Sequence, residues 1–223
     1  VEQLADDPEK LVLGGETKKM TFLFCDVRGF TTISEAFKSD PQGLTKLINR
    51  FLTPLTNEII SKNGTIDKYM GDCIMAFWNA PIDVEGHEKI SCDAALSMHK
   101  ALKELNDIRE KEAREAKKDF LELKIGIGLN TGGCVVGNMG SDQRFDYTVL
   151  GDIVNLSSRL EGQTKTYGMT AVLSSYTVDE LGEDEKEIGE NILEIDKIKV
   201  KGKKDPETIF GLASDKISED EKK

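Results

Sequence analysis

The stretch Met20–Glu35, MTFLFCDVRGFTTISE, limits the folds open to this chain more than any other segment. It begins as an apolar, strand-like run, carries Asp26 at the end of that run, and passes through a flexible Val27-Arg28-Gly29 turn into the start of a helix. A carboxylate at the end of a buried strand is costly unless a cation or a hydrogen-bond donor meets it. The sequence therefore predicts a partner for Asp26, which is a metal ion, an arginine or water.

Composition narrows the class of protein. The 223 residues are 38% hydrophobic and 32% charged, which is typical of a globular chain with a highly charged surface. The net charge of −11 argues against non-specific binding to nucleic acid or to an anionic membrane, although a local basic pocket could still take a phosphorylated ligand. No signal peptide is visible, and no run approaches the roughly 18 apolar residues of a membrane span.

The four cysteines are scattered along the chain without a CxxC pair. Their sequence neighbours are apolar, which favours buried thiols in a reducing compartment over disulfides or a zinc site.

Apolar periodicity predicts one domain of mixed helices and strands. We expect strands at Met20–Val27, Thr65–Met70, Cys73–Trp78, Leu121–Asn130, Cys134–Asn138, Phe145–Leu150, Thr170–Leu173, Ile192–Val200 and Thr208–Leu212. We expect helices at Phe30–Phe37, 41–62, Glu88–Lys118 and Ile153–Tyr167, and a helical turn at Thr177–Leu181. Thr131-Gly132-Gly133 is predicted to be a turn between two strands. This order of elements indicates an α+β fold in which helices cover one face of a sheet.

The boundaries of the domain follow from composition. Residues 1–17 are polar and glycine-containing and are predicted to be a lead-in, residues 18–213 form the domain, and residues 214–223 form a charged, disordered tail. Because the chain begins at Val1 rather than Met, we expect a piece of a longer protein, from which an upstream sensor or membrane segment has been removed.

Two carboxylates adjoin apolar strand segments, with a glycine within three residues of each. Asp72 follows Gly71 in a predicted hairpin, and taken alone it is explained more simply as ordinary turn chemistry. Asp26 is harder to explain without a partner. If adjacent strands brought the two together, they would repel each other unless a hard cation such as Mg²⁺ bridged them. Spacing alone leaves the metal site and the purely structural explanation equally open.

Two further groups of polar residues could bind phosphate. Asn155 and Arg159 are four residues apart on one predicted helix, so they share a face, and an arginine fork and an amide suit phosphate and hydroxyl groups. The stretch KVKGKK, Lys199–Lys204, places clustered lysines in a glycine-containing loop. Taken alone, each group is explained more simply as a solvated polar face or a basic hairpin loop.

In combination, these segments resemble a class III nucleotidyl cyclase catalytic domain. Four motifs stand in the family's order: FLFCDVRGFT, DKYMGDCIMAF, FDYTVLGDIVNLSSRLE and KVKGK. The resemblance runs from about Lys18 to Leu212. It implies a ferredoxin-like central antiparallel sheet with helices, and an adenylyl cyclase that converts ATP to 3′,5′-cyclic AMP and pyrophosphate.

The resemblance implies a metal site and a base-reading pair. Asp26 and Asp72, with the backbone carbonyl of Val27, would hold two Mg²⁺ or Mn²⁺ ions, and Arg28 would then not be the partner of Asp26. Lys68 and Thr148 match the pair that reads the purine. Lys with Asp or Thr implies adenine, whereas guanylyl cyclases usually carry Glu and Cys at these positions.

The resemblance also implies the groups that bind ribose and phosphate. Asn155 would orient the ribose, Arg159 would meet the α-phosphate, and Lys201 would meet the β- and γ-phosphates. Gly29 would let the Phe30-Thr31 backbone amides approach the triphosphate. Asp26 is a candidate general base, but a metal-bound carboxylate is a weak base, so water or substrate phosphate is the alternative.

The family forms a head-to-tail dimer with shared sites, and this chain holds both residue sets, so the resemblance implies a homodimer with two equivalent sites. It further implies a cytoplasmic catalytic domain. Thr148 resembles the soluble-type subgroup, some members of which respond to bicarbonate, and this response stays open here. The alternatives are a guanylyl cyclase and a non-catalytic nucleotide-binding dimerisation module.

Overall fold

The structure is a computed structural model of the chain that describes residues 14–141, 143–182, 188, 191–199 and 206–213. The predicted tail and Lys201 lie outside these residues. The elements are β1 (Gly14–Val27), α2 (Phe30–Ala36), α3 (Pro41–Ser61), β2 (Thr65–Met70), β3 (Cys73–Trp78), α4 (His87–Glu115), β4 (Ile125–Ser141), β5 (Arg144–Leu150), α5 (Asp152–Tyr167), β6 (Ala171–Ser174), α6 (Ser175–Leu181), β7 (Ile192–Ile198) and β8 (Glu207–Leu212).

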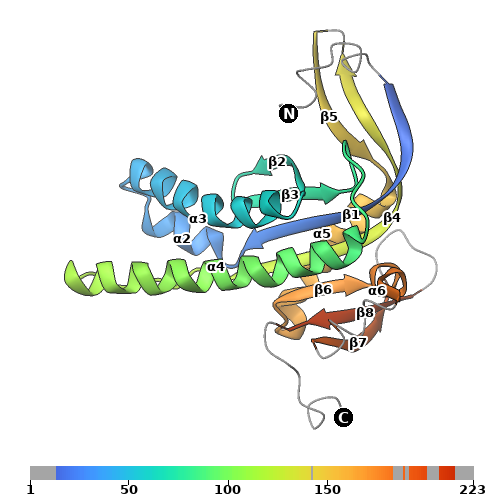
Figure 1. The fold of residues 1–223 in the computed structure, drawn as a ribbon. Helices are drawn as coiled ribbons and strands as arrows, with labels where there is room; N and C mark the ends of the chain where they lie inside the picture. The colour runs from blue at the N-terminus through green and yellow to red at the C-terminus, as the bar shows by residue number, and fades with distance from the viewer. Residues whose placement is uncertain (1–13, 142, 183–187, 189–190, 200–205, 214–223) are drawn as a thin grey trace.

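The described strands form one eight-stranded sheet in the order β2-β3-β1-β4-β6-β8-β7, with β5 paired to β4 (Figure 1). Strands β1 to β4 with α2, α3 and α4 between them give the ferredoxin-like order β2-β3-β1-β4, in which all neighbours are antiparallel. Among the described strands, only β4 and β6 pair in parallel, and α5 makes the crossover that a parallel pair requires. The predicted α+β class and ferredoxin-like sheet are confirmed.

Strand β1 is longer than the sequence predicted. It begins at Gly14, inside the segment predicted to be a lead-in, and pairs with β4 along its whole length, from Gly14 opposite Asn138 to Val27 opposite Ile125. For the same reason the predicted turn at residues 131–133 is wrong. Thr131 to Gly133 have ladder partners on β1, so β4 continues through them as one strand. Figure 1 shows this end of β1 rising beside the β4–β5 arm.

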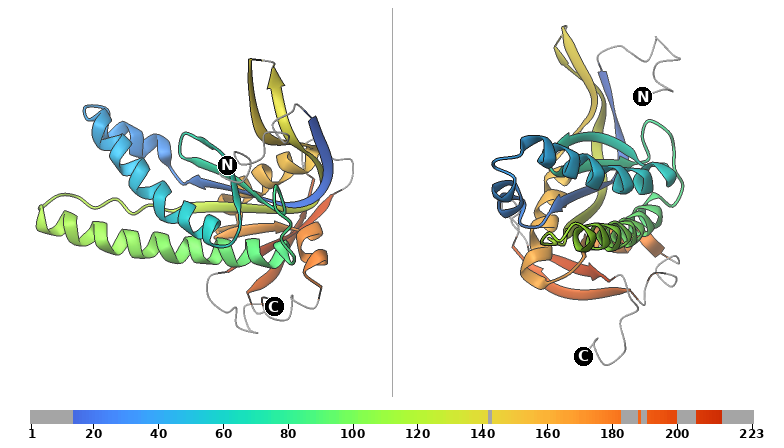
Figure 2. Two further views of the ribbon diagram at one scale, coloured as in Figure 1. Left: turned by 45° about the horizontal axis from the view of Figure 1, so that its top comes forward. Right: turned by 90° about the vertical axis from the view of Figure 1, so that its left-hand side faces the viewer.

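Helices cover both faces of the sheet, so the prediction that they share one face is wrong. Alternate residues of a strand point to opposite faces. Leu23 and Cys25 of β1 belong to the apolar core that contains Phe51 of α3 and Met98 of α4. Leu156 of α5 belongs to a separate cluster on the other face, together with residues of β6 and β8. Figures 1 and 2 show α3 and α4 lying side by side, with α5 across the sheet from them.

Two glycines of β4 decide how closely α5 approaches the sheet. A Cβ atom added at Gly128 would meet the backbone of Ser157 and Glu161, and one at Gly126 would meet the side chains of Thr164 and Glu161. At Gly128 any larger residue would push the helix away, because the helix backbone that it meets cannot move as a flexible side chain can. The helix therefore rests directly on the β4 backbone.

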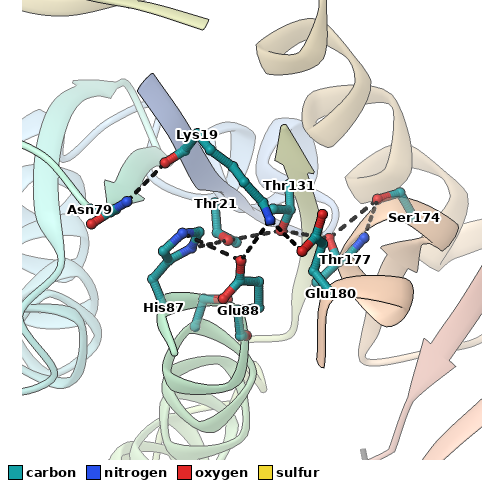
Figure 3. Close-up of polar contacts among 10 residues, drawn as sticks. Lys19, Thr21, Asn79, His87, Glu88, Thr131, Ser174, Thr177 and Glu180 are labelled. Atoms are coloured by element: carbon teal, nitrogen blue, oxygen red, sulfur yellow. Dashed lines mark hydrogen bonds and ion pairs between the residues drawn. The ribbon is translucent and has the colours of Figure 1, made fainter. Parts of the chain in front are cut away.

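A buried chain of hydroxyl groups joins α4 and α6 to the middle of the sheet (Figure 3). Thr21 Oγ1 of β1 lies 2.8 Å from His87 Nδ1 and 2.8 Å from Thr131 Oγ1 of β4. Thr131 donates in turn to Thr177 of α6, and Ser174, the N-cap of α6, accepts from the Thr177 backbone N–H. Buried hydroxyls must find partners, so this network fixes where both helices begin.

Charged groups close the network at its solvent side. Lys19 forms ion pairs with Glu88 of α4 and Glu180 of α6, and Glu88 also lies 3.3 Å from His87 Nε2. Burial is the main cause that lowers the pKa of His87, so the ring is held neutral within the network.

Replacing Thr131 by Val should remove the central hydroxyl while keeping its shape. We expect Thr131→Val to lower the free energy of unfolding by about 1 kcal/mol, because Thr21 and Thr177 each keep one other partner. Urea unfolding followed by circular dichroism measures this, with Thr45→Val, which alters an exposed hydroxyl of α3, as control. Equal effects of the two variants would contradict a role for the buried network.

Candidate active site

The sheet brings Asp26 and Asp72 together. Asp26 is at the end of β1, and Asp72 is in the β2–β3 turn, where Gly71 takes a left-handed conformation with φ +67°. Because β1 and β3 are antiparallel and Cys25 of β1 is opposite Ile74 of β3, the residue after Cys25 and the residues before Ile74 lie at the same end of the two strands. The pKa of Asp72 is raised to about 6, mainly by burial, with contributions from the charge of Asp26 and from a hydrogen bond with its carboxyl. The two carboxylates are close enough to repel each other.

This pair fits a divalent cation. The raised pKa of Asp72 reflects its burial and the neighbouring charge of Asp26, and carboxylate oxygens are the ligands that Mg²⁺ prefers. Within the described residues, no group of three or more His, Cys, Asp or Glu side chains is arranged to hold a metal. A cation between Asp26 and Asp72 would therefore need further oxygen ligands, such as a backbone carbonyl, water or substrate phosphate.

Arg28 does not pair with Asp26. Its guanidinium donates to the carbonyl oxygens of Thr164, at 3.1 Å, and Met169, at 2.5 Å. Thr164 is in the last turn of α5, where carbonyl groups lack helical partners and the helix dipole favours a cation. Arg28 is therefore not the partner of Asp26, which agrees with what the family resemblance implied.

Glu161 is a member of this site that the sequence analysis missed. Its Oε1 atom lies against the place that a Cβ atom of Gly126 would occupy, and Gly126 is directly opposite Asp26 in the β1–β4 ladder. Burial and, to a smaller extent, the charges of Asp26 and Asp72 raise the pKa of Glu161 to about 7, while the charge of Arg28 opposes the rise. The alternation of Gly126 and Gly128 was the signal available in the sequence, because it indicates a helix packed on the strand.

The face of helix α5 that points away from Glu161 carries Asn155 and Arg159. Asn155 is exposed and Arg159 is partly exposed, whereas Leu156 and Leu160 are buried against the sheet. Arg159 and Glu161 are two residues apart, which is a rotation of about 200° around the helix. Within the described part of the chain, no hydrogen bond or ion pair involves the side chains of Asn155 or Arg159.

The remaining predicted residues are spread over several elements. Lys68 is on β2 with its side chain 47% exposed, and Thr148 is on β5 opposite Gly137, half-buried. Gly29 is left-handed, with φ +73°, and precedes α2, to which no side chain supplies a cap. Among the described contacts, none joins Lys68 or Thr148 to Asp26, so one chain does not assemble all the predicted residues.

The sequence matches, over residues 14–213, the family described as the adenylate and guanylate cyclase catalytic domain. Since this match covers most of the chain, the protein belongs to the class III nucleotidyl cyclase family. The ferredoxin-like sheet and the paired carboxylates at the β1 and β3 ends are consistent with this membership. The family is generally dependent on divalent metal ions.

Curated relatives include an adenylate cyclase from Anabaena cylindrica, 37% identical over 195 residues. The match covers 87% of this chain and 36% of that protein. Adenylate cyclase 1 from Rhizobium meliloti is 34% identical over 161 residues, covering 72% of this chain and 23% of the relative. This chain thus spans about a third or less of the length of these two relatives.

Solved structures of similar fold include one cyclase named for adenylyl and one named for guanylyl substrates. The adenylyl cyclase CyaB from P. aeruginosa has a TM-score of 0.76 at 32% identity, over 90% of this chain and 96% of that one. The guanylyl cyclase Cya2 has a TM-score of 0.74 at 31% identity, over 93% and 96%. Overall similarity therefore does not choose between the two purines. Among the described residues, no helix is long and apolar enough to cross a membrane.

We expect Glu161→Gln to make the metal-free protein more stable at pH 8. A carboxyl whose pKa is raised from 4.5 to about 7 binds more protons in the folded state, so stability falls as pH rises through this window. The neutral variant avoids that loss, by about 1–2 kcal/mol once partial contact with solvent is allowed for.

Urea unfolding at pH 5 and pH 8 in the presence of EDTA tests this. Wild type should lose stability between the two values and Glu161→Gln should lose less, whereas Glu110→Gln, which alters an exposed pair with Arg114, should follow wild type. A pH dependence of Glu161→Gln identical to wild type would show that this carboxyl is not destabilised by its neighbours.

Proposed function

We propose that this chain is an adenylyl cyclase domain that converts ATP to 3′,5′-cyclic AMP and pyrophosphate. The observation that carries the proposal is the pair of adjacent carboxylates, Asp26 and Asp72, at the edge of a cyclase-family sheet. The relatives from Anabaena cylindrica and Rhizobium meliloti bear the name adenylate cyclase, which supports the same activity.

The choice of adenine rests on Lys68 and Thr148. A Lys ammonium can donate to N1 of adenine, and a Thr hydroxyl can accept from the 6-amino group. Guanine has a protonated N1, which cannot accept from the ammonium, and a 6-oxo acceptor in place of the 6-amino donor. A site built on such bonds discriminates strongly, because the wrong base leaves polar groups unpaired. This residue pair disfavours the alternative, a guanylyl cyclase, even though Cya2 is similar in fold.

In the proposed reaction the ribose 3′-hydroxyl attacks the α-phosphorus in line, and pyrophosphate leaves. Asp26, Asp72 and the Val27 carbonyl would hold two divalent ions, Mg²⁺ or Mn²⁺, which when bound lower the pKa of the hydroxyl and neutralise the triphosphate. Arg159 stabilises charge that develops on the α-phosphoryl oxygens, and Asn155 orients the ribose.

Two further groups are proposed to bind the rest of the triphosphate. Lys201 pairs with the β- and γ-phosphates. The left-handed Gly29 lets the Phe30 and Thr31 backbone N–H groups approach the same phosphates, and no side chain competes for these groups as a cap. Both assignments follow the family motifs.

The site is proposed to be shared between two copies of the chain in a homodimer. Helix α5 supports this, because Glu161 faces Asp26 of the same chain while Asn155 and Arg159 are turned away from it. A side chain on that outer face serves a carboxylate pair only if the pair belongs to another chain. Each copy would thus supply metal ligands to one site and Arg159 to the other.

The presence of both residue sets in one chain disfavours a non-catalytic dimerisation module. A bicarbonate response, a cytoplasmic location and an upstream sensor or membrane segment stay predictions.

Mixing two inactive variants tests the shared site. Asp26→Ala and Arg159→Ala should each reduce cyclic AMP formation by at least about a hundredfold, because each removes charge stabilisation of phosphoryl transfer. Mixed dimers should regain activity, since one of their two sites combines intact residues from both chains. Cyclic AMP and cyclic GMP are measured from ATP and GTP with Mg²⁺ and with Mn²⁺.

Dimers carrying two different affinity tags should be isolated, so that mixed species are verified. Verified mixed dimers without activity would contradict shared sites. Substantial activity of Asp26→Ala alone would contradict the metal assignment, and absence of cyclic AMP formation by wild type would contradict the proposed function.

Exchanging the base-reading pair tests purine selection. The double variant Lys68→Glu with Thr148→Cys should lower the ratio of kcat/KM for ATP to that for GTP by about tenfold or more, since the donor and acceptor pattern is altered. The exchange Lys38→Glu, on an exposed residue after α2, is the charge-matched control. An unchanged ratio would remove Lys68 and Thr148 from base selection.

A further inference from the structure

Strand β2 contains a bulge at Asp67. The ladder with β3 pairs Ile66 with Ala76 and then Lys68 with Met75, so Asp67 has no residue opposite it. In a regular strand, adjacent side chains point to opposite faces. A bulge breaks this alternation and redirects a side chain. Here it lets the side chains of Asp67 and Lys68 meet, with Lys68 Nζ 3.1 Å from Asp67 Oδ2.

The two members of this pair lie in different environments. The Asp67 side chain is 0% exposed, whereas the Lys68 side chain is 47% exposed. Within the described residues, neither carboxylate oxygen of Asp67 has a hydrogen-bond partner, so the contact with Lys68 is an ion pair without an aligned hydrogen bond. Lys68 is the only cation that the described contacts place beside this carboxylate.

A buried carboxylate without hydrogen bonds is unfavourable, and an ion pair to a half-exposed lysine compensates for only part of that. Stability of the hairpin alone does not explain the arrangement, since a neutral residue would fill the bulge without that penalty. A buried polar group without a hydrogen-bond partner is rare and needs an explanation, of which a functional role is one. The role that fits Asp67 is to place the ammonium group of Lys68.

We propose that Asp67 is a positioning residue that holds the Lys68 ammonium at the height and orientation from which it donates to N1 of adenine, and that it thereby contributes to the preference for ATP over GTP. This rests on the proposed function, in which Lys68 reads the purine. Since Asp67 is fully buried and Lys68 is half exposed, the ammonium can turn one N–H toward a base while the carboxylate stays behind it.

Fixing the Lys68 ammonium has different consequences for adenine and for guanine. An ammonium fixed by a carboxylate presents donors only, which match the N1 acceptor of adenine and oppose the N1–H of guanine. Without Asp67, the flexible lysine stem can move the ammonium aside when guanine enters. Removal of the carboxylate should therefore weaken use of ATP more than use of GTP.

Asp67→Asn tests this, because it keeps the shape of the side chain and removes its charge. We expect kcat/KM for ATP to fall by about tenfold, the loss of one charge-assisted contact, mainly through KM, while that for GTP changes by less than about threefold. Asp67→Glu, which keeps the charge, should recover part of the ATP preference. Asp83→Asn is the matched control, since Asp83 pairs with Lys18 at 2.5 Å but is 90% exposed.

A double-mutant cycle with Lys68→Met supplies a second measurement. In the Lys68→Met background, Asp67→Asn should have no further effect on the ATP-to-GTP ratio, because the group that it positions is gone. It should also raise the urea midpoint of Lys68→Met, since it neutralises a buried carboxylate left without a cation. A structural role alone would lower ATP and GTP use equally.

The two proposals can fail separately. If wild type forms neither cyclic nucleotide, the proposed function fails, and displacement of a fluorescent ATP analogue by ATP and by GTP then measures base preference in the same variants. Equal loss for both nucleotides in Asp67→Asn, or additive effects of Asp67→Asn and Lys68→Met on their ratio, would overturn the assignment of Asp67.

Discussion

Repulsion between Asp26 and Asp72 is the interaction on which this site depends. Antiparallel pairing of β1 with β3 brings the two carboxylates to the same end of these strands. Burial there is the main cause that raises the pKa of Asp72 to about 6. Within the described part of the chain, no ion pair involves either carboxylate, and Arg28 binds the carbonyl groups of Thr164 and Met169 instead. The fold therefore concentrates negative charge at one place, where a divalent cation can bind and a substrate phosphate can complete its coordination shell.

Two glycines of β4 determine which residues of α5 face Asp26 of the same chain and which face outward. Gly126 and Gly128 allow α5 to lie directly on the strand, which turns Glu161 toward Asp26. The same helix then presents Asn155 and Arg159 to the outside, where the chain itself offers them no partner among the described contacts. A close helix–strand contact thus separates the residues that act within one chain from those that we assign to a second chain.

Much of the fold could be predicted because it follows local patterns. The hairpin strands Thr65–Met70 and Cys73–Trp78 were predicted with their observed bounds, since two short segments, the second of them apolar, flank a Gly-Asp turn. The sequence failed where long-range pairing overrides local signals. Residues 131–133 contain two glycines and were predicted to be a turn, but β1 supplies each with a ladder partner. The second layer, formed by α5, was missed because helix periodicity does not say which face of a sheet a helix covers.

The sequence by itself determined the residue types of the site, namely two carboxylates at strand ends, a Lys and Thr pair, and an Asn and Arg on one helix face. Types and spacing are properties of the chain, and they sufficed to indicate the family. Only the tertiary structure decided that Asp26 and Asp72 meet, that Glu161 joins them and that Asp67 lies buried behind Lys68. Each of these depends on strand register or on a bulge, which arise from pairing between segments distant in sequence.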